Sequence, residues 1–275
     1  MATPGAHWRA LAGRMRGWSL LAALCLAAPA ALAGHPCGPP QNDAASVIKG
    51  LDLAEKTWHA LDASGAQVAL IARAGQDISK YGLVYSHMAL VWRDHPEGRW
   101  LVVHELNTCG TASSALYNEG LGNFFLDDMY LYQTEIIVPA PALQASLARL
   151  LASPTAQRLH EDHYNMVSYA FSTQYQNSNQ WVLEMLAAAS AAPGAIENRS
   201  EAQAWLKAAN FEPITLDIPA TTRLGARMFS ANVAFDDHPF GRRMAGQIDT
   251  VTVDSVFRFV QRRDPAVQHI VLAEP

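Results

Sequence analysis

The sequence is poor in charged residues. Of its 275 residues only 16% are charged and half are hydrophobic, which provides ample apolar material for a packed core and excludes a disordered scaffold. Basic residues are the scarcer charge, with 20 Lys and Arg against 25 Asp and Glu. Because a nucleic-acid-binding protein needs basic surface to displace the counterions of phosphates, this balance argues against a nucleic-acid partner.

Long apolar runs are missing after the N-terminus. No segment beyond residue 33 contains the roughly 18 uninterrupted apolar residues of a membrane span, so no stable span is expected there. Residues 1–33 have an arginine-bearing start, a short apolar run interrupted by Pro29, and an Ala-Leu-Ala sequence directly before Gly34. This order predicts a cleavable signal peptide and hence an exported, periplasmic protein. Cleavage would leave 242 residues with 17 basic and 25 acidic side chains, a net charge of −8.

Two other interpretations of this N-terminal segment stay open. Cys25 could mark a lipid-attachment site, although bulky Leu24 stands where such sites need a small residue. The segment could also be an uncleaved signal anchor.

Cysteine is scarce as well, with three in the whole sequence. Once Cys25 leaves with the signal, Cys37 and Cys109 remain. In an oxidising compartment a lone pair is most simply a disulfide, which would tie the mature N-terminus to a loop after a core strand. The alternative is a free, nucleophilic Cys109, because sequence cannot show that two sulfurs meet.

Apolar patterning predicts one α+β domain over residues 34–275, with an antiparallel sheet and packed helices. Strand residues are bounded by Gly, Pro or Asp, and helical segments have apolar positions about 3.6 residues apart. We find no repeat, low-complexity tract or long charge block. The predicted helices are 44–61, 142–151, 178–190, 201–209 and 222–230, and the predicted strands are 68–72, 86–92, 100–106, 131–138, 250–260 and 267–272.

Two histidines are expected on one face of a hairpin. Arg93 to Gly98 has turn chemistry, so the flanking strands should pair antiparallel, with Trp92 opposite Arg99 and His87 opposite His104. Opposed residues share a face, and the neighbours on that face are Ala89, Val91 and Val102. Burying an imidazole without a partner is costly, so these histidines are either satisfied within the core or used for chemistry.

The start of the helix predicted over 178–190 is the second candidate element. Asn177 can cap the helix, with Gln180 three positions later completing a capping-box pattern, which places Ser178 in the first turn. A nucleophile there would face the positive end of the helix dipole and free backbone N–H groups. Capping alone also explains the Asn-Ser-Asn cluster, so both interpretations stay open.

Taken together, these elements resemble the circularly permuted NlpC/P60 (papain-like) hydrolases, which include the lecithin retinol acyltransferase-like enzymes. The strand pair Tyr-Ser-His-Met-Ala-Leu-Val (85–91) and Trp-Leu-Val-Val-His (100–104) is similar to theirs. Asn-Ser-Asn-Gln-Trp-Val (177–182) resembles their Asn-Cys-x-x-aromatic-Val helix start, and Gly-Gln-Asp (75–77) lies about where their Gly-Asp motif falls. These short motifs span about residues 73–186, and most of the mature chain also resembles an exported bacterial family of unknown function.

The resemblance implies a base at His87, an orienting residue at His104 and a nucleophile at position 178. Asn177, Asn179 and Asp77 are the accompanying site residues, although Asp77 also suits a surface pair with a nearby basic residue. The departure is that position 178 is Ser where these families use Cys. A helix dipole and an imidazole can generate a thiolate at neutral pH, but a hydroxyl needs a base to take its proton during attack.

Two functions follow as hypotheses. The first is an exported amide or ester hydrolase or acyltransferase, for which the resemblance suggests peptidoglycan stem peptides or lipid acyl groups as substrates. The second is a catalytically inactive domain that binds a cell-wall, envelope or lipid-like ligand in the same cleft. No cofactor is expected in either case.

A metal enzyme is a third option. It would use the histidines of His-Glu-Asp-His (160–163), spaced to share a helical face, or Asp-Asp-His (236–238). No strict zinc motif such as H-E-x-x-H occurs, so we interpret 160–163 as a solvated polar turn and predict no metal site.

Overall fold

The computed structural model describes residues 42–127 and 129–274. The predicted signal peptide with its two alternatives, and Cys37, lie outside the described residues, so export and the Cys37–Cys109 disulfide stay predictions. The elements in chain order are α2 (Ala44–Ser64), β1 (Val68–Ala74), the 3-10 helix η1 (Ser79–Tyr81), β2 (His87–His95), β3 (Gly98–Asn107), β4 (Ser114–Gly120), α3 (Leu121–Leu126), β5 (Leu131–Val138), α4 (Pro141–Leu151), α5 (Thr155–Arg158), α6 (Ser178–Ser190), α7 (Arg199–Ala208), β6 (Ile214–Asp217), α8 (Ala220–Phe229), α9 (Phe240–Met244), β7 (Gln247–Thr250), α10 (Val253–Arg263) and β8 (Gln268–Ala273).

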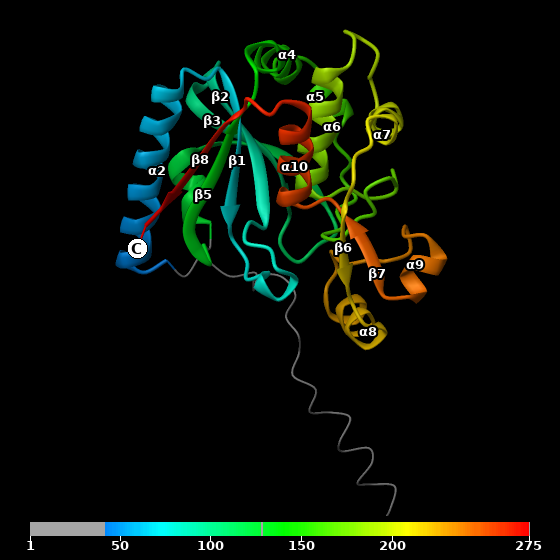
Figure 1. Cartoon of the computed structure of the whole chain (residues 1–275). Helices are drawn as coiled ribbons and strands as arrows, with labels where there is room; N and C mark the ends of the chain where they lie inside the picture. The colour runs from blue at the N-terminus through cyan, green and yellow to red at the C-terminus, as the bar shows by residue number, and fades with distance from the viewer. Residues whose placement is uncertain (1–41, 128, 275) are drawn as a thin grey trace, which may run out of the picture.

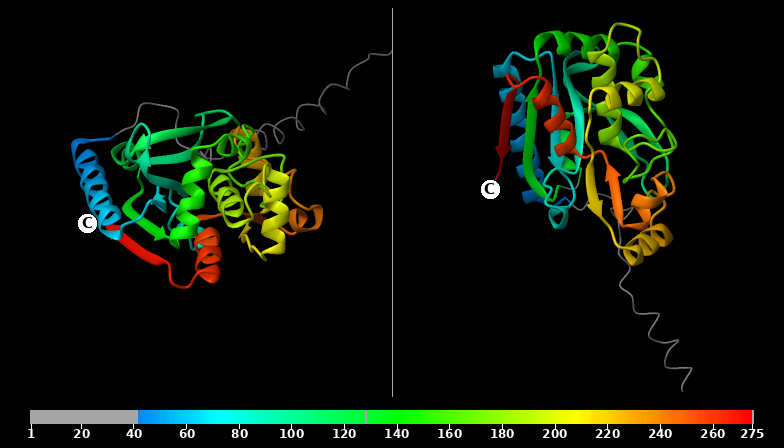
Figure 2. Two further views of the ribbon diagram at one scale, coloured as in Figure 1. Left: turned by 90° about the horizontal axis from the view of Figure 1, so that it is seen from above. Right: turned by 45° about the vertical axis from the view of Figure 1, so that its right-hand side comes forward.

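A six-stranded antiparallel sheet with the order β4-β3-β2-β1-β5-β8 forms the centre of the described chain. Helices cover both faces, with α2 and α3 on one side and α4, α6 and α10 on the other (Figures 1 and 2). β1 is buried at every position because it is central in the sheet and covered on both faces, which explains the apolar run over its first five residues, 68–72. The expectation of an α+β protein with an antiparallel sheet and packed helices is therefore confirmed.

A second, smaller sheet pairs β6 with β7. Together with α8 and α9 it extends to one end of the molecule (Figure 1). Apolar side chains of this second sheet and of nearby loops form a separate cluster, which we call the loop cluster. This cluster joins the β6–β7 sheet to the segments 78–83 and 166–167, and its buried members are Leu83, Leu216, Ile218, Val233, Phe235 and Ile248.

The histidine hairpin has a tighter turn than predicted. A two-residue turn, Pro96-Glu97, joins β2 to β3, and Trp92 pairs with Leu101 instead of Arg99. The predicted opposition of His87 and His104 is therefore wrong, because the strands continue through residues that have turn chemistry but form the exposed tip of the hairpin. The register shift is two residues, and an even shift leaves every side chain on its predicted face.

One predicted strand is wrong. Residues 250–260 were expected to be extended because they are rich in β-branched residues, but α10 begins at Val253. Thr252 and Ser255 form a reciprocal capping box at its start, with the Thr252 hydroxyl accepting from the Ser255 N–H at 3.2 Å and the Ser255 hydroxyl accepting from the Thr252 N–H at 2.9 Å. The local cap outweighs the strand propensity of the valines.

None of the helices formed by the described residues has the length and hydrophobicity needed to cross a membrane.

Candidate functional site

The structure brings the side chains of Ser178, His87 and His104 together. Nδ1 of His87 lies 2.9 Å from Oγ of Ser178, and Nε2 of the same ring lies 2.9 Å from Nδ1 of His104. Both distances are those of good hydrogen bonds. The three residues come from the start of β2, the middle of β3 and the first turn of α6, so the arrangement depends on the tertiary fold.

Two asparagines hold the start of α6 in place. Asn177 caps the helix, since its side-chain oxygen accepts the Gln180 N–H at 2.9 Å, and its amide donates to the Thr250 hydroxyl at 3.1 Å. The Asn179 side chain accepts the N–H of Met88 at 3.0 Å. Because Met88 follows His87, this bond fixes the turn that contains Ser178 relative to the His87 imidazole. The predicted capping box does not close, because the Gln180 side chain turns away to Ser168, Ala170 and Glu184.

Glu119 of β4 completes the series and was not predicted from the sequence. Its Oε1 lies 3.4 Å from Nε2 of His104, an electrostatic contact that falls short of good hydrogen-bond alignment. In the β3–β4 pairing, Tyr117 is opposite His104 and Glu119 is two residues further along β4, hence on the same face. The four side chains run in the order Ser178, His87, His104, Glu119.

Burial and charge keep both imidazoles neutral. Desolvation, followed by the nearby positive charge of Arg73, lowers the pKa of His87 well below its usual range. Burial also lowers the pKa of His104, and Glu119 opposes that shift. The Arg73 guanidinium lies 4.8 Å from the centre of the Phe124 ring and is paired with Asp127. Phe124 in turn contacts both imidazoles, with ring centres 6.0 and 5.7 Å away.

A tyrosine approaches the serine from the loop before α6. The Tyr164 hydroxyl interacts with the Ser178 side chain, and burial raises the pKa of Tyr164. The phenol therefore stays protonated and neutral at physiological pH. No sequence signal marked this residue, because it is separated from Ser178 by a loop whose path is set by tertiary contacts.

The site is almost closed to solvent. The exposed fractions are 4% for Ser178, 8% for His87 and 0% for His104. Tyr164 interacts with the Ser178 side chain, and two residues further along the chain the Met166 carbonyl oxygen accepts from the Asn177 amide at 3.4 Å. Another molecule can reach Oγ of Ser178 only if part of the protein around it moves.

Asp77 is not part of this arrangement. It is exposed in the turn before η1, where its carboxylate accepts from the Ser79 N–H at 3.0 Å and from the Ser79 hydroxyl at 2.6 Å. Asp127, not Asp77, pairs with Arg73. The local turn thus accounts for the Gly-Gln-Asp motif in this structure.

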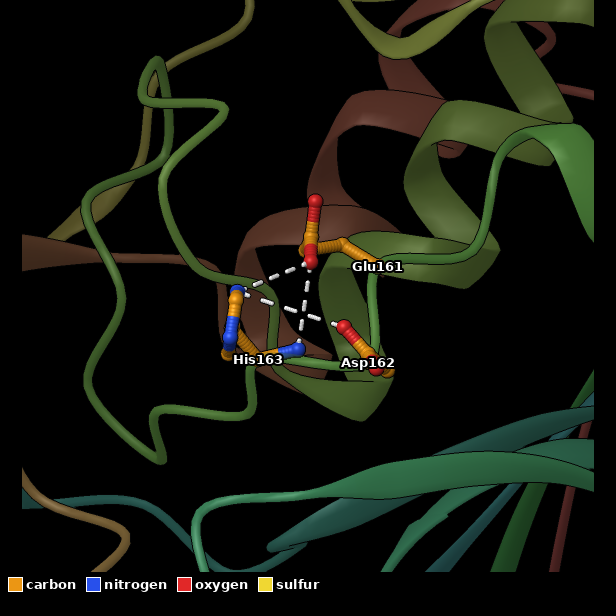
Figure 3. A group of neighbouring side chains, drawn as sticks. All are labelled: Glu161, Asp162 and His163. Atoms are coloured by element: carbon orange, nitrogen blue, oxygen red, sulfur yellow. Dashed lines mark hydrogen bonds and ion pairs between the residues drawn. The ribbon is translucent and has the colours of Figure 1, made fainter.

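The histidines of the 160–163 segment do not share a helix face as their spacing suggested. α5 ends at Arg158, and His160 turns inward to within 3.0 Å of the Ser114 hydroxyl. Within the described ranges, Glu161, Asp162 and His163 form one group whose possible ligand atoms lie within 4.8 Å of one another (Figure 3). His163 is 72% exposed and its Nδ1 lies 3.3 Å from the Glu161 carboxylate, so a surface contact between neighbouring residues explains the grouping.

The second acidic segment is tied into the protein. The Asp237 carboxylate accepts the Tyr169 N–H at 2.7 Å, and Nε2 of His238 lies 2.8 Å from the Val167 carbonyl oxygen. Asp236 instead pairs with Arg227 at the surface. These three side chains point to three different partners, so they fix the loop.

Comparison with known proteins gives one result. A family model described as "Uncharacterized protein conserved in bacteria (DUF2145)" matches residues 60–260. No curated protein and no solved structure matches the chain. The match covers most of the chain and includes Ser178, both histidines of the site and Glu119. The protein therefore belongs to this bacterial family.

Proposed function

We propose that this member of the DUF2145 family is an exported acyl hydrolase or acyltransferase in which Ser178 is the nucleophile. The observation that carries the proposal is the 2.9 Å contact between Oγ of Ser178 and Nδ1 of His87 at the first turn of a helix. A serine needs a base within hydrogen-bond reach, and here the base is itself held by a second residue.

The direction of hydrogen bonding along the four residues supports this role. A carboxylate only accepts, so Glu119 favours the His104 tautomer with its proton on Nε2. Nδ1 of His104 then accepts from Nε2 of His87, which leaves the lone pair on Nδ1 of His87 free for the Ser178 hydroxyl. Every contact in the series is thus consistent with a neutral His87 ready to take a proton.

The start of α6 supplies the electrostatic part of the mechanism. Ser178 and Asn179 occupy the first turn, whose N–H groups have no intrahelical acceptor and lie at the positive end of the helix dipole. Such donors stabilise the oxyanion that forms when a carbonyl is attacked. The neutral hydroxyl of Tyr164, next to Ser178, is a further donor for the same charge.

The reaction proceeds in two halves. Oγ of Ser178 bonds to the acyl carbon while its proton passes to Nδ1 of His87, and His87 then protonates the leaving nitrogen or oxygen as that bond to carbon breaks. Water, or the hydroxyl or amine of an acceptor, releases the acyl group by the reverse proton path. The resemblance to permuted NlpC/P60 hydrolases favours peptidoglycan stem peptides or lipid acyl groups as substrates.

The permuted papain-like fold and the export route belong to the same proposal. The fold is supported by the chain order of a strand histidine, a histidine on the next strand and a helix-opening serine around an antiparallel sheet. The periplasmic location rests on the sequence of residues 1–33.

The near-complete burial of Ser178 favours one competing function. A satisfied Ser-His-His network in the core of an inactive domain would also be closed to solvent, and such a domain would bind an envelope ligand without turnover. The two functions differ in whether Oγ of Ser178 reacts.

A fluorophosphonate probe separates them. Wild type should be labelled on Ser178, Ser178→Ala should not, and His87→Gln should be labelled at least about a hundredfold more slowly, because general-base catalysis contributes 10²–10⁴-fold. Ser190→Ala, at the exposed far end of the same helix, is the matched control and should be labelled like wild type.

A Ser178→Cys variant tests the site from the other direction. At a helix start beside an imidazole the new thiol should react with iodoacetamide faster than a free thiol at pH 7. If wild type resists the phosphonate and releases no product from peptidoglycan, peptide and ester substrates, the catalytic proposal is wrong.

A further inference from the structure

The most exposed large apolar side chains of the described chain are concentrated at one end of the molecule. Leu224 and Met228 of α8 are 64% and 67% exposed, and Phe240 and Met244 of α9 are 69% and 63% exposed. Each pair is spaced i, i+4, so each lies along one face of its helix. Figures 1 and 2 place both helices beyond the β6–β7 sheet, away from the central sheet. We call these four side chains the apolar tip.

The same two helices are strongly basic in an acidic protein. The whole chain has a net charge of −5, yet α8 and α9 carry four arginines and no Asp or Glu. Arg227 and Arg242 pair with Asp236 and Asp249 respectively. The other two, Arg223 and Arg243, donate to backbone carbonyl oxygens, which leaves their positive charge uncompensated by those contacts.

The exposure of the apolar tip is built into a packed unit. The inner side of α8 contacts the loop cluster through Ala226. Arg243 donates to the Phe235 carbonyl oxygen at 3.1 Å, which ties α9 to the same cluster. The outward direction of the four side chains therefore follows from how α8 and α9 are anchored.

Apolar side chains beside arginines on short helices suit the surface of a lipid bilayer. The apolar groups can enter the boundary between headgroups and acyl chains, while the positive charge of the half-buried Arg223 and Arg243 attracts the lipid phosphates. A second copy of the chain fits less well, because pairing two such tips would bring like-charged arginines together on helices that carry no carboxylate. We propose that the apolar tip docks this protein on an anionic lipid bilayer.

Sedimentation with vesicles tests the docking. The protein as isolated from the cell should bind vesicles containing phosphatidylglycerol more strongly than vesicles of phosphatidylcholine alone, and high salt should weaken the binding. Replacing Leu224, Met228, Phe240 and Met244 by Gln should reduce the partition coefficient at least about tenfold. All versions share the same N-terminal residues, so the difference between them isolates the apolar tip.

Ile48→Gln is the matched control. Ile48 is 59% exposed on α2, on the other side of the sheet from α8 and α9 (Figure 1), and its replacement should leave binding unchanged. Equal vesicle binding by wild type and the fourfold variant, or no vesicle binding at all, would overturn the proposal. So would a wild-type dimer in light scattering that the fourfold variant abolishes, because the tip would then be a self-association surface.

The docking does not depend on the proposed catalysis. Ser178→Ala should bind vesicles as wild type does, since Ser178 is buried and lies outside α8 and α9. A protein that binds vesicles but is never labelled on Ser178 would retain the docking and lose the catalytic function. Labelling of Ser178 without vesicle binding would retain the catalytic function and overturn the docking.

Discussion

Glu119 illustrates how one residue can influence the direction in which every hydrogen bond of a series is donated. It does not touch Ser178, and His104 and His87 lie between them. In the proposed mechanism its charge favours the proton on Nε2 of His104, and through that ring it determines which nitrogen of His87 accepts. Glu119 is therefore a positioning residue.

Glu119→Gln should slow phosphonate labelling of Ser178 by roughly tenfold to a hundredfold without changing the thermal midpoint by more than a few degrees. We expect less than the about 10⁴-fold effect of removing a carboxylate bonded directly to the catalytic histidine, because here an imidazole intervenes. The labelling rate should also rise at a different pH from wild type, which a purely structural role would not produce. Glu97→Gln, at the exposed turn between β2 and β3, is the control. Wild-type labelling by Glu119→Gln at all pH values would show that the carboxylate has no orienting role.

Three of the four members of this series, Ser178, His87 and His104, were predicted from the sequence. His87 and His104 were marked by being polar on an apolar face, and Ser178 by its place at a helix start. Glu119 carried no such signal, because β4 reads Ser-Ala-Leu-Tyr-Asn-Glu-Gly and lacks the alternation that predicts a strand. A residue whose role comes from cross-strand proximity can be found only when the neighbouring strand is recognised.

At the scale of elements, local capping decides between competing propensities. The strands β1 and β5 were predictable because they are apolar and bounded by turn residues. The register of the β2–β3 hairpin was not, because Arg93, Asp94 and His95 favour a turn by type but continue β2 in the structure. The start of α10 was missed for the related reason that Thr252 and valines favour strands in isolation.

Thr252→Ala should destabilise the protein by about 0.5–2 kcal/mol, the usual cost of losing a helix N-cap. Thr252→Ser keeps the hydroxyl that accepts from Ser255, so it should retain most of that free energy while losing only a methyl group. Urea unfolding of both variants measures the difference. Equal destabilisation by Ala and Ser would assign the effect to packing of the buried Thr252 methyl instead of the cap.

At the scale of the whole molecule, stability should depend on pH through buried ionisable groups. Glu105 of β3 is completely buried, and in the described part of the chain neither of its carboxylate oxygens has a well-aligned hydrogen-bond partner. Burial raises the pKa of Glu105 from 4.5 to about 8. The folded protein thus holds this proton more tightly than the unfolded chain does. The contribution of Glu105 to the free energy of unfolding is complete below pH 4.5 and is lost as the pH rises to about 8.

Glu105→Gln removes this pH dependence because an amide does not titrate. The variant should match wild type within about 1 kcal/mol near pH 4.5 and be more stable by on the order of 3–5 kcal/mol at pH 9, since a tenfold difference in proton affinity between the folded and unfolded chain corresponds to about 1.4 kcal/mol. Denaturant unfolding across this pH range gives the measurement. Glu55→Gln, whose parent side chain is 74% exposed, is the control and should run parallel to wild type. A constant difference between Glu105→Gln and wild type at all pH values would mean that Glu105 ionises normally.

The 4% exposure of Ser178 has a kinetic consequence. A reagent or substrate can reach the hydroxyl only during the fraction of time in which the covering loops are displaced. The observed rate is then limited by opening once the reagent is abundant, so it should level off with concentration instead of rising in proportion. The labelling rate of small electrophiles should level off at a higher value than that of bulky ones, because small reagents need a smaller and more frequent opening. The cover would thus act as a filter on what reacts, independent of how nucleophilic the serine itself is.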